Sequence, residues 1–290
     1  MFNGALTALA TPFRDGEVDV PALRDLVEWQ IQSGIDGLVP CGSTGESATL
    51  SHAEHDKVIK LTIEQTRKRV PVIAGTGSNS TAEAIRLTAA AREMGADGAL
   101  LLSPYYNKPT QDGIYRHYKT IASSVDLPLF VYNIPGRTAS NVLPETVARL
   151  AEIKHIVGIK EASGSMDQSS DILRMCGDRI TILSGDDALT LPLIALGAKG
   201  VISTCSNIVP REMHELAAAA LGGDFVKARE IHFRLLPLMR ALFVETNPIP
   251  IKQALAFMGK CANELRLPLV QMTAGPAEKL RVAMKELRLV

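Results

Sequence analysis

The sequence lacks an excess of either charge. Its 290 residues carry 31 Lys and Arg side chains against 31 Asp and Glu side chains, so the formal net charge is zero. Nucleic-acid-binding proteins collect phosphate groups with a basic surface, and no Lys/Arg-rich run provides such a surface here. We therefore expect that nucleic acid is not a partner.

The sequence also lacks paired cysteines and a long hydrophobic run at its start. Cys41, Cys176, Cys205 and Cys261 lie far apart and form no C-x-x-C pair, so they predict neither a zinc site nor a disulfide framework. Residues 1–16 have no basic leader and are too short to cross a bilayer. These features predict a protein of the cytoplasm, with reduced thiols and no membrane partner.

What the chain does contain is an alternation of short apolar runs with longer stretches of helical periodicity. The apolar runs are continuous, as in buried parallel strands, and the unit repeats about eight times. We expect strands at residues 5–10, 37–41, 71–76, 98–103, 128–133, 156–160, 180–185 and 200–204. Helices are expected between them, for example at 20–34, with Asp19 as its N-cap, and at 81–95, both ending on a glycine.

Eight strand–helix units predict a (β/α)8 TIM barrel, here assigned to residues 1–224, with the active site at the carboxyl ends of the strands. The alternative is a doubly wound open sheet. Against it, the turn after the second strand lacks the G-x-G-x-x-G spacing, and a six-stranded sheet would leave two strands unassigned.

Residues 225–290 are predicted to form a C-terminal α-helical domain. From residue 210 onward the pattern is helical, with segments at 211–223, 224–242, 249–259 and 274–287. Pro237, Pro248, Pro250 and Pro268 interrupt this region without a Gly/Ser linker, so we expect it to pack against the barrel.

The strand "IVGIK" ends on Lys160, although a lysine is costly to bury. An ammonium group in apolar surroundings loses hydration, which favours the neutral amine and makes a lysine nucleophilic near neutral pH. The alternative is a lysine whose stem is buried while its ammonium group reaches water. Lys160 is therefore a candidate nucleophile, and the question is what surrounds it.

A barrel would gather further candidates at the same rim, namely Thr44, Tyr106, Tyr132 and Arg137. A tyrosine hydroxyl can move the protons that imine chemistry requires, although a buried tyrosine is also an ordinary core residue. The turn "GSTGES", residues 42–47, offers N–H groups and hydroxyls to a carboxylate or phosphate, or is a simple turn with an N-cap. Arg137 could hold a carboxylate through two hydrogen bonds, or it is an exposed loop arginine.

Metal binding is the remaining chemical alternative. His52 and His55 lie three residues apart on a predicted helix, but no third ligand with supporting spacing is evident. Asp186, followed by Asp187, is predicted to be a helix N-cap instead of a cation ligand. We expect no metal.

Several motifs resemble the dihydrodipicolinate synthase family, within the pyruvate-dependent Schiff-base aldolases and lyases related to N-acetylneuraminate lyase. They are "GSTGES" (42–47), "SPYYNKP" (103–109), "VYNIPGRT" (131–138), "GIKEASG" (158–164), "SGDD" (184–187) and "GVIST" (200–204), and the resemblance covers essentially the whole chain. It implies a lyase of the diaminopimelate and lysine route. Such an enzyme condenses pyruvate with L-aspartate 4-semialdehyde to give 4-hydroxy-tetrahydrodipicolinate, and it needs no cofactor beyond a covalent imine between pyruvate and Lys160.

The resemblance also implies a role for each matching position. Thr44, Tyr132 and Tyr106 look like a proton relay, with Tyr106 reaching into a neighbouring subunit. Arg137 would hold the semialdehyde carboxylate, and Ser43 and Thr44 the pyruvate carboxylate, although many members have threonine where this chain has Ser43. Gly185 and Ile202 are similar to positions that shape the pocket.

A second resemblance concerns regulation by L-lysine. The residues similar to the lysine-binding site of feedback-inhibited members are Ser47, Ala48, His52, His55, Asn79, Glu83 and Tyr105. The family resemblance further implies a homo-oligomer, either a dimer or a tetramer built as a dimer of dimers, and we expect the tetramer.

Two rival functions remain open at this point. A sibling enzyme, such as an N-acetylneuraminate lyase or a ketodeoxy-sugar-acid aldolase, would use the same lysine, but Arg137 favours a short, charged aldehyde over a sugar acid. A non-catalytic sensor of pyruvate or lysine would have no need of the lysine, tyrosine and threonine set.

Overall fold

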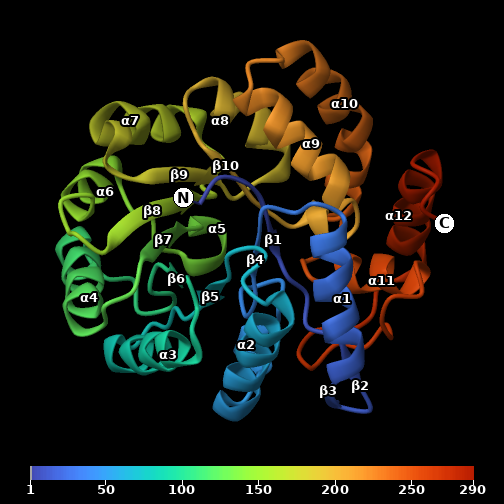
Figure 1. The fold of residues 1–290 in the computed structure, drawn as a ribbon, viewed down its shortest axis with the longest axis horizontal. Helices are drawn as coiled ribbons and strands as arrows, with labels where there is room; N and C mark the ends of the chain where they lie inside the picture. The colour runs from blue at the N-terminus through green and yellow to red at the C-terminus, as the bar shows by residue number, and fades with distance from the viewer. Residues whose placement is uncertain (1) are drawn as a thin grey trace.

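The computed structural model describes residues 2–290, and its centre is a barrel of eight parallel strands (Figure 1). The strands are β1 (Gly4–Ala8), β4 (Gly37–Val39), β5 (Ile73–Gly75), β6 (Gly98–Leu102), β7 (Leu129–Asn133), β8 (Ile156–Glu161), β9 (Thr181–Ser184) and β10 (Gly200–Ser203). All eight expected strands are present, each somewhat different in length from its apolar run.

The two ends of the sheet, β4 and β5, pair with each other and close the barrel. The sheet order runs from β4 through β1, β10, β9, β8, β7 and β6 to β5. Leu38 N–H then donates to the Pro71 carbonyl at 3.0 Å, and Gly75 N–H donates to the Pro40 carbonyl at 2.9 Å. The predicted (β/α)8 barrel is confirmed, because an open doubly wound sheet would leave these edges unpaired.

Helices surround the strands, and a side chain caps the N-terminus of several of them. The helices are α1 (Val20–Gln32), α2 (His52–Thr66), α3 (Thr81–Met94), α4 (Gln111–Ser124), α6 (Pro144–Leu150), α7 (Met166–Cys176), α8 (Thr190–Ala195) and α9 (Pro210–Leu221). Those capped by a side chain are α1, α2, α3, α4 and α7. Asp19 accepts a hydrogen bond from Ala22 N–H, as predicted, and Asp186 likewise caps the short turn that begins at Asp187. The motif "GSTGES" leads first into a 3₁₀ turn (Ser47–Thr49), so the α-helix begins later, at His52, where Ser51 and Glu54 form a capping box.

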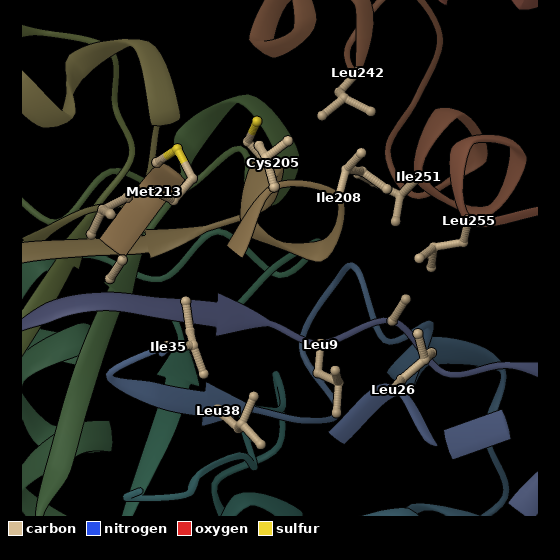
Figure 2. Packing of buried hydrophobic residues seen from close by; sticks show 14 of the residues in the cluster. Leu9, Leu26, Ile35, Leu38, Cys205, Ile208, Met213, Leu242, Ile251 and Leu255 are labelled. Atoms are coloured by element: carbon tan, nitrogen blue, oxygen red, sulfur yellow. The ribbon is translucent and has the colours of Figure 1, made fainter. Parts of the chain in front are cut away.

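The chain ends in three further helices, α10 (Phe225–Ala241), α11 (Ile249–Phe257) and α12 (Ala274–Glu286). Figure 2 shows apolar side chains of this region, such as Leu242, which follows α10, and Ile251 and Leu255 of α11, in one buried cluster with Leu9 and Leu26. The C-terminal region therefore packs against the barrel as expected. A short hairpin, β2 (Phe13–Arg14) with β3 (Glu17–Val18), lies beside it and was not predicted from the sequence.

The inside of the barrel is filled, so any cavity must lie at its rim. Leu6, Ile73, Phe130 and Leu183 point into the interior from four different strands and form one buried cluster. Ile202 belongs to the same cluster and is fully buried there. Because the interior is filled, functional side chains are expected at the carboxyl ends of the strands, where TIM barrels have their active sites.

Candidate active site

Lys160 lies near the carboxyl end of β8, beside Tyr132 of the neighbouring strand β7. The parallel register pairs the two residues directly, and the Lys160 Nζ lies 4.2 Å from the centroid of the Tyr132 ring. Lys160 is 5% exposed, and Tyr132 is also buried. The register therefore turns two residues that are 28 positions apart into immediate neighbours, with the amine stacked on the phenol ring.

Gly185 makes room for the stem of this lysine. A Cβ atom at position 185 would lie 3.1 Å from both Cγ and Cε of Lys160 and 2.5 Å from Cβ of Ala162. A side chain at this position would push the lysine aside or displace the strand. The predicted role of Gly185 in shaping the pocket is consistent with this contact.

A small cavity opens above Lys160 and collects six of the predicted residues. Ser43, Thr44, Tyr132, Arg137, Lys160 and Gly185 all line it, together with Ala8, Val39, Gly42, Leu100, Ile134, Thr204, Phe243 and Asn247. The lining combines apolar side chains with hydroxyl, amide, amine and guanidinium groups, as in a site for a small polar molecule.

Ser43 and Thr44 reach the cavity on a tight turn. The N–H groups of Gly45 and Ser47 donate to the Gly42 carbonyl, and the Thr11 hydroxyl donates to the Gly45 carbonyl at 2.8 Å. A Cβ atom at Gly45 would lie 3.0 Å from the backbone of the preceding turn, so the close approach needs a glycine. The turn thus holds two hydroxyl groups at the cavity wall.

Arg137 lies at the mouth of the cavity, on the short helix α5 (Pro135–Thr138) that follows β7. The side chain is exposed, and one of its terminal N–H groups donates to the Asn247 carbonyl at 2.9 Å. Its remaining donors are available to a ligand carboxylate at the mouth.

Of the eight lining residues that sequence reasoning did not find, three lie late in the chain, namely Thr204, Phe243 and Asn247. Asn247 is buried; its side-chain N–H₂ group donates to the Thr44 hydroxyl at 3.0 Å, and its Oδ1 has no hydrogen-bond partner among residues 2–290. Phe243 and Asn247 belong to the link between α10 and α11, which folds back over the barrel mouth. A sequence pattern gives no signal for such a contact, because only the packing of the C-terminal helices brings this link to the rim.

Asp187 supports Thr204 from below. The N–H groups of Thr204 and Cys205 donate to its carboxylate at 3.1 and 2.9 Å. The carboxylate is buried, and burial raises the pKa of Asp187 to about 6 despite these hydrogen bonds. Asp187 therefore fixes the backbone at the end of β10, one step removed from the cavity.

Two predicted residues do not line the cavity of a single chain. Ile202 lies below it, within the filled barrel. Tyr106 is 89% exposed, and its backbone is left-handed, with φ of 69°.

The candidates for a lysine site form two contacts near the starts of α2 and α3. His52 Nε2 lies 2.9 Å from a carboxylate oxygen of Glu83, and the Asn79 side chain donates to the Tyr105 carbonyl at 3.2 Å. His55 instead turns inward, with its Nε2 2.8 Å from the Gly75 carbonyl, and burial lowers its pKa. Ser47 and Ala48 lie on the 3₁₀ turn that precedes α2.

Across residues 2–290, no three His, Cys, Asp or Glu side chains gather where they could hold a metal ion. No helix in the same range is both long and apolar enough to span a bilayer.

Relatives of known name match this chain over its full length. The 4-hydroxy-tetrahydrodipicolinate synthase of Syntrophus aciditrophicus is 60% identical over 290 residues, covering 100% of both chains. The enzyme of the same name from Geobacter metallireducens is 57% identical, again over 100% of both chains. The expected activity, that of a lyase forming 4-hydroxy-tetrahydrodipicolinate, is confirmed by this agreement.

Solved structures give the same result. The dihydrodipicolinate synthase of Aquifex aeolicus has a TM-score of 0.98 and 51% identity, covering 99% of both chains. The chloride-inhibited enzyme of Acinetobacter baumannii in complex with pyruvate has a TM-score of 0.99 and 46% identity, and that of Cyanidioschyzon merolae with lysine bound has 0.97 and 42%. These cover 100% of this chain and 100% and 99% of the respective solved chains.

A family model matches as well, that of the Dihydrodipicolinate synthetase family, over residues 1–287. With the barrel, the buried Lys160 and the full-length relatives in agreement, the chain belongs to the Dihydrodipicolinate synthetase family.

Proposed function

We propose that Lys160 is the nucleophile that carries the condensation of pyruvate with L-aspartate 4-semialdehyde. The observation that supports this most strongly is the buried amine facing a small cavity, beside a phenol and two hydroxyl groups. The amine attacks the keto carbon of pyruvate, and the oxygen leaves as water, which forms an imine. The imine activates pyruvate by itself, so the proposal requires no cofactor.

The imine then loses a proton from the pyruvate methyl carbon and becomes an enamine. The enamine carbon attacks the aldehyde carbon of L-aspartate 4-semialdehyde, forming the new carbon–carbon bond and a hydroxyl group. The amino group of that substrate next attacks the imine carbon and displaces Lys160, which closes the ring and frees the enzyme. These steps move protons to and from carbon, nitrogen and oxygen, and we assign this proton transfer to Tyr132, Thr44 and Tyr106.

The carboxylates of the two substrates need separate places. Ser43 and Thr44 lie on the turn that walls the cavity, so we assign the pyruvate carboxylate to them. Arg137 lies at the mouth, where the second substrate enters, and its guanidinium suits a carboxylate better than the hydroxyl groups of a sugar acid. Gly185 gives Lys160 its space, and Ile202 supports the floor of the pocket from within the barrel.

Borohydride reduction in the presence of pyruvate tests this assignment. We expect mass spectrometry of the digested protein to locate a reduced pyruvate adduct on Lys160, and we expect Lys160→Ala to form none. The second buried lysine, Lys252, provides an internal control, because it lies outside the cavity. An adduct on any other residue, or no adduct in the wild-type protein, would contradict the proposed nucleophile.

We further propose a homo-oligomer, a tetramer built as a dimer of dimers, with L-lysine as an effector at a subunit interface. The pair His52–Glu83 and the contact Asn79–Tyr105 form an exposed polar group of suitable chemistry for an amino acid. A solved relative was crystallised with lysine bound. Millimolar L-lysine should lower the steady-state rate, and an unchanged rate would remove this part of the proposal.

We also propose the cytoplasm as the compartment in which the protein works. All four cysteines are free thiols, and three of them are buried. Free thiols are typical of a reducing compartment.

A further inference from the structure

Lys252 is a buried lysine that the mechanism does not use. It lies on α11 and is 0% exposed. Its Nζ lies 3.0 Å from Oε1 of Glu46, donates to the Glu264 carbonyl at 2.8 Å and lies 4.2 Å from the centroid of the Phe13 ring. Burial lowers the pKa of Lys252, while the carboxylate of Glu46 favours its charged form. A lysine this deeply buried needs a reason, because a buried ion pair is weak as a source of stability.

Its partner, Glu46, belongs to the turn that carries Ser43 and Thr44. Glu46 is 4% exposed, and its backbone is left-handed, with φ of 54°. Such a backbone is unfavourable for a residue other than glycine, so other contacts must hold it. Besides Lys252, the N–H group of Arg266 donates to the second carboxylate oxygen of Glu46 at 3.3 Å. The carboxylate therefore fixes the end of the turn to two separate points of the C-terminal region.

A second contact joins the same turn to the same helix. Asn247, directly before Pro248 at the start of α11, donates from its side chain to the Thr44 hydroxyl. Lys252 N–H donates to the Pro248 carbonyl at 2.9 Å, within the first turn of that helix. The beginning of α11 thus holds the turn at Thr44, which lines the cavity, and at Glu46, which does not.

We propose that Glu46 and Lys252 are positioning residues, whose buried ion pair sets the turn 42–47 so that Ser43 and Thr44 face the pyruvate bound to Lys160. This inference rests on the proposed use of that turn for the pyruvate carboxylate. Neither residue touches substrate. The C-terminal helices, which lie outside the barrel, become part of the pyruvate site through this pair.

The role of the pair can be tested by removing one charge or both, because the stability of the fold and the position of the turn 42–47 should then change differently. Removing one charge leaves the other buried and unpaired, which destabilises the fold. Removing both also removes the cost of burying charge, so stability largely returns. The geometry of the turn does not return, because an amide and a thioether do not attract each other as the ions do.

The experiment compares Glu46→Gln, Lys252→Met and the double variant with the wild-type protein. The melting temperature, the KM for each substrate, kcat and the rate of borohydride trapping with pyruvate are measured for each. We expect both single variants to melt at lower temperature and the double variant to regain most of this loss. We expect the double variant still to show a KM for pyruvate raised roughly tenfold and kcat/KM lowered by up to about 10²-fold, as for a misplaced catalytic group.

Lys260→Met is the matched control. Lys260 follows α11, and its Nζ lies 3.7 Å from the Trp29 ring centroid, away from the turn. It should keep both KM values of the wild-type protein. The KM for L-aspartate 4-semialdehyde should change little in the double variant too, because Arg137 is held by the Asn247 carbonyl and not by the ion pair.

A double variant that melts like the wild-type protein and keeps its KM for pyruvate would overturn the inference and leave the pair a purely structural one. If the double variant does not fold, Glu46→Gln, which preserves the shape of the side chain, is judged by the same comparison of KM values. Failure of the proposed function would be recognised separately, since the wild-type protein itself would then give no adduct on Lys160.

Discussion

Two buried lysines of this chain show how surroundings decide what a residue does. Lys252 has the carboxylate of Glu46 at 3.0 Å and a backbone carbonyl at 2.8 Å, so its donors are used within the protein. Lys160 has no carboxylate within ion-pair distance in the part of the chain that the structure describes, and its amine faces a cavity. The same side chain thus has an acidic partner within the protein in one place and faces a cavity in the other.

The role of Tyr132 can be tested at the same scale by removing its hydroxyl group. Tyr132→Phe keeps the ring that lies against Lys160 but removes the hydroxyl that would relay protons. We expect kcat to fall by roughly 10²–10⁴-fold, the usual size of lost acid–base assistance, while the melting temperature changes little. Steady-state kinetics and thermal unfolding measure the two effects. A variant that turns over at the wild-type rate would exclude Tyr132 from the relay.

At the scale of elements, the sequence pattern is sufficient to predict a strand where consecutive residues are all buried. The pattern identifies every strand of the barrel because both faces of each strand are covered, one by the filled barrel and one by helices, and its residues are therefore mainly apolar. The parallel register of β7 and β8 then brings Tyr132 and Lys160 together.

The pattern was insufficient where a contact depends on tertiary packing alone. Asn247 and Phe243 carry no local signal, since their link is placed at the rim by the docking of α10 and α11 against the barrel. The β2–β3 hairpin was missed because each of its strands has only two residues, too few to show alternation. The partner contact that we propose for Tyr106 likewise leaves no local pattern in the sequence.

The contact between α3 and α4 should make stability depend on pH. His117 of α4 is buried, its Nδ1 lies 2.9 Å from the Thr81 hydroxyl, and its Nε2 has no hydrogen-bond partner among residues 2–290. Burial lowers the pKa of His117 from 6.5 to about 4. The unfolded chain therefore binds a proton at higher pH than the folded chain, and the stability that this group contributes is complete above pH 6.5 and lost as the pH falls towards 4.

We expect this histidine to account for about 2 kcal/mol of lost unfolding free energy between pH 7 and pH 5. Denaturant unfolding at the two pH values measures the loss. In His117→Gln, which cannot take up the proton, the difference between pH 7 and pH 5 should shrink by about that amount. The exposed surface histidine His52, changed to Gln, serves as the control. An equal acid loss in wild type and His117→Gln would show that other groups cause it.

At the scale of the whole molecule, the exposed Tyr106 supports our proposal that neighbouring subunits complete each other's active sites. A tyrosine that is 89% exposed buries little surface within its own chain, although its left-handed backbone is strained. A second subunit would supply the missing contacts if it buried this side chain. In a symmetric dimer each chain would then give its tyrosine to the other and receive one in return.

Mixing two inactive variants distinguishes a tyrosine shared between subunits from one that serves its own chain. Lys160→Ala lacks the nucleophile but offers an intact Tyr106, whereas Tyr106→Phe keeps the nucleophile and lacks the phenol. If Tyr106 enters the partner's site, a mixed dimer contains one site with both groups. Random pairing makes half of the dimers mixed, so co-refolded variants should recover about a quarter of the wild-type kcat. If Tyr106 serves its own chain, no site in the mixture holds both groups, and the activity stays at the average of the two variants.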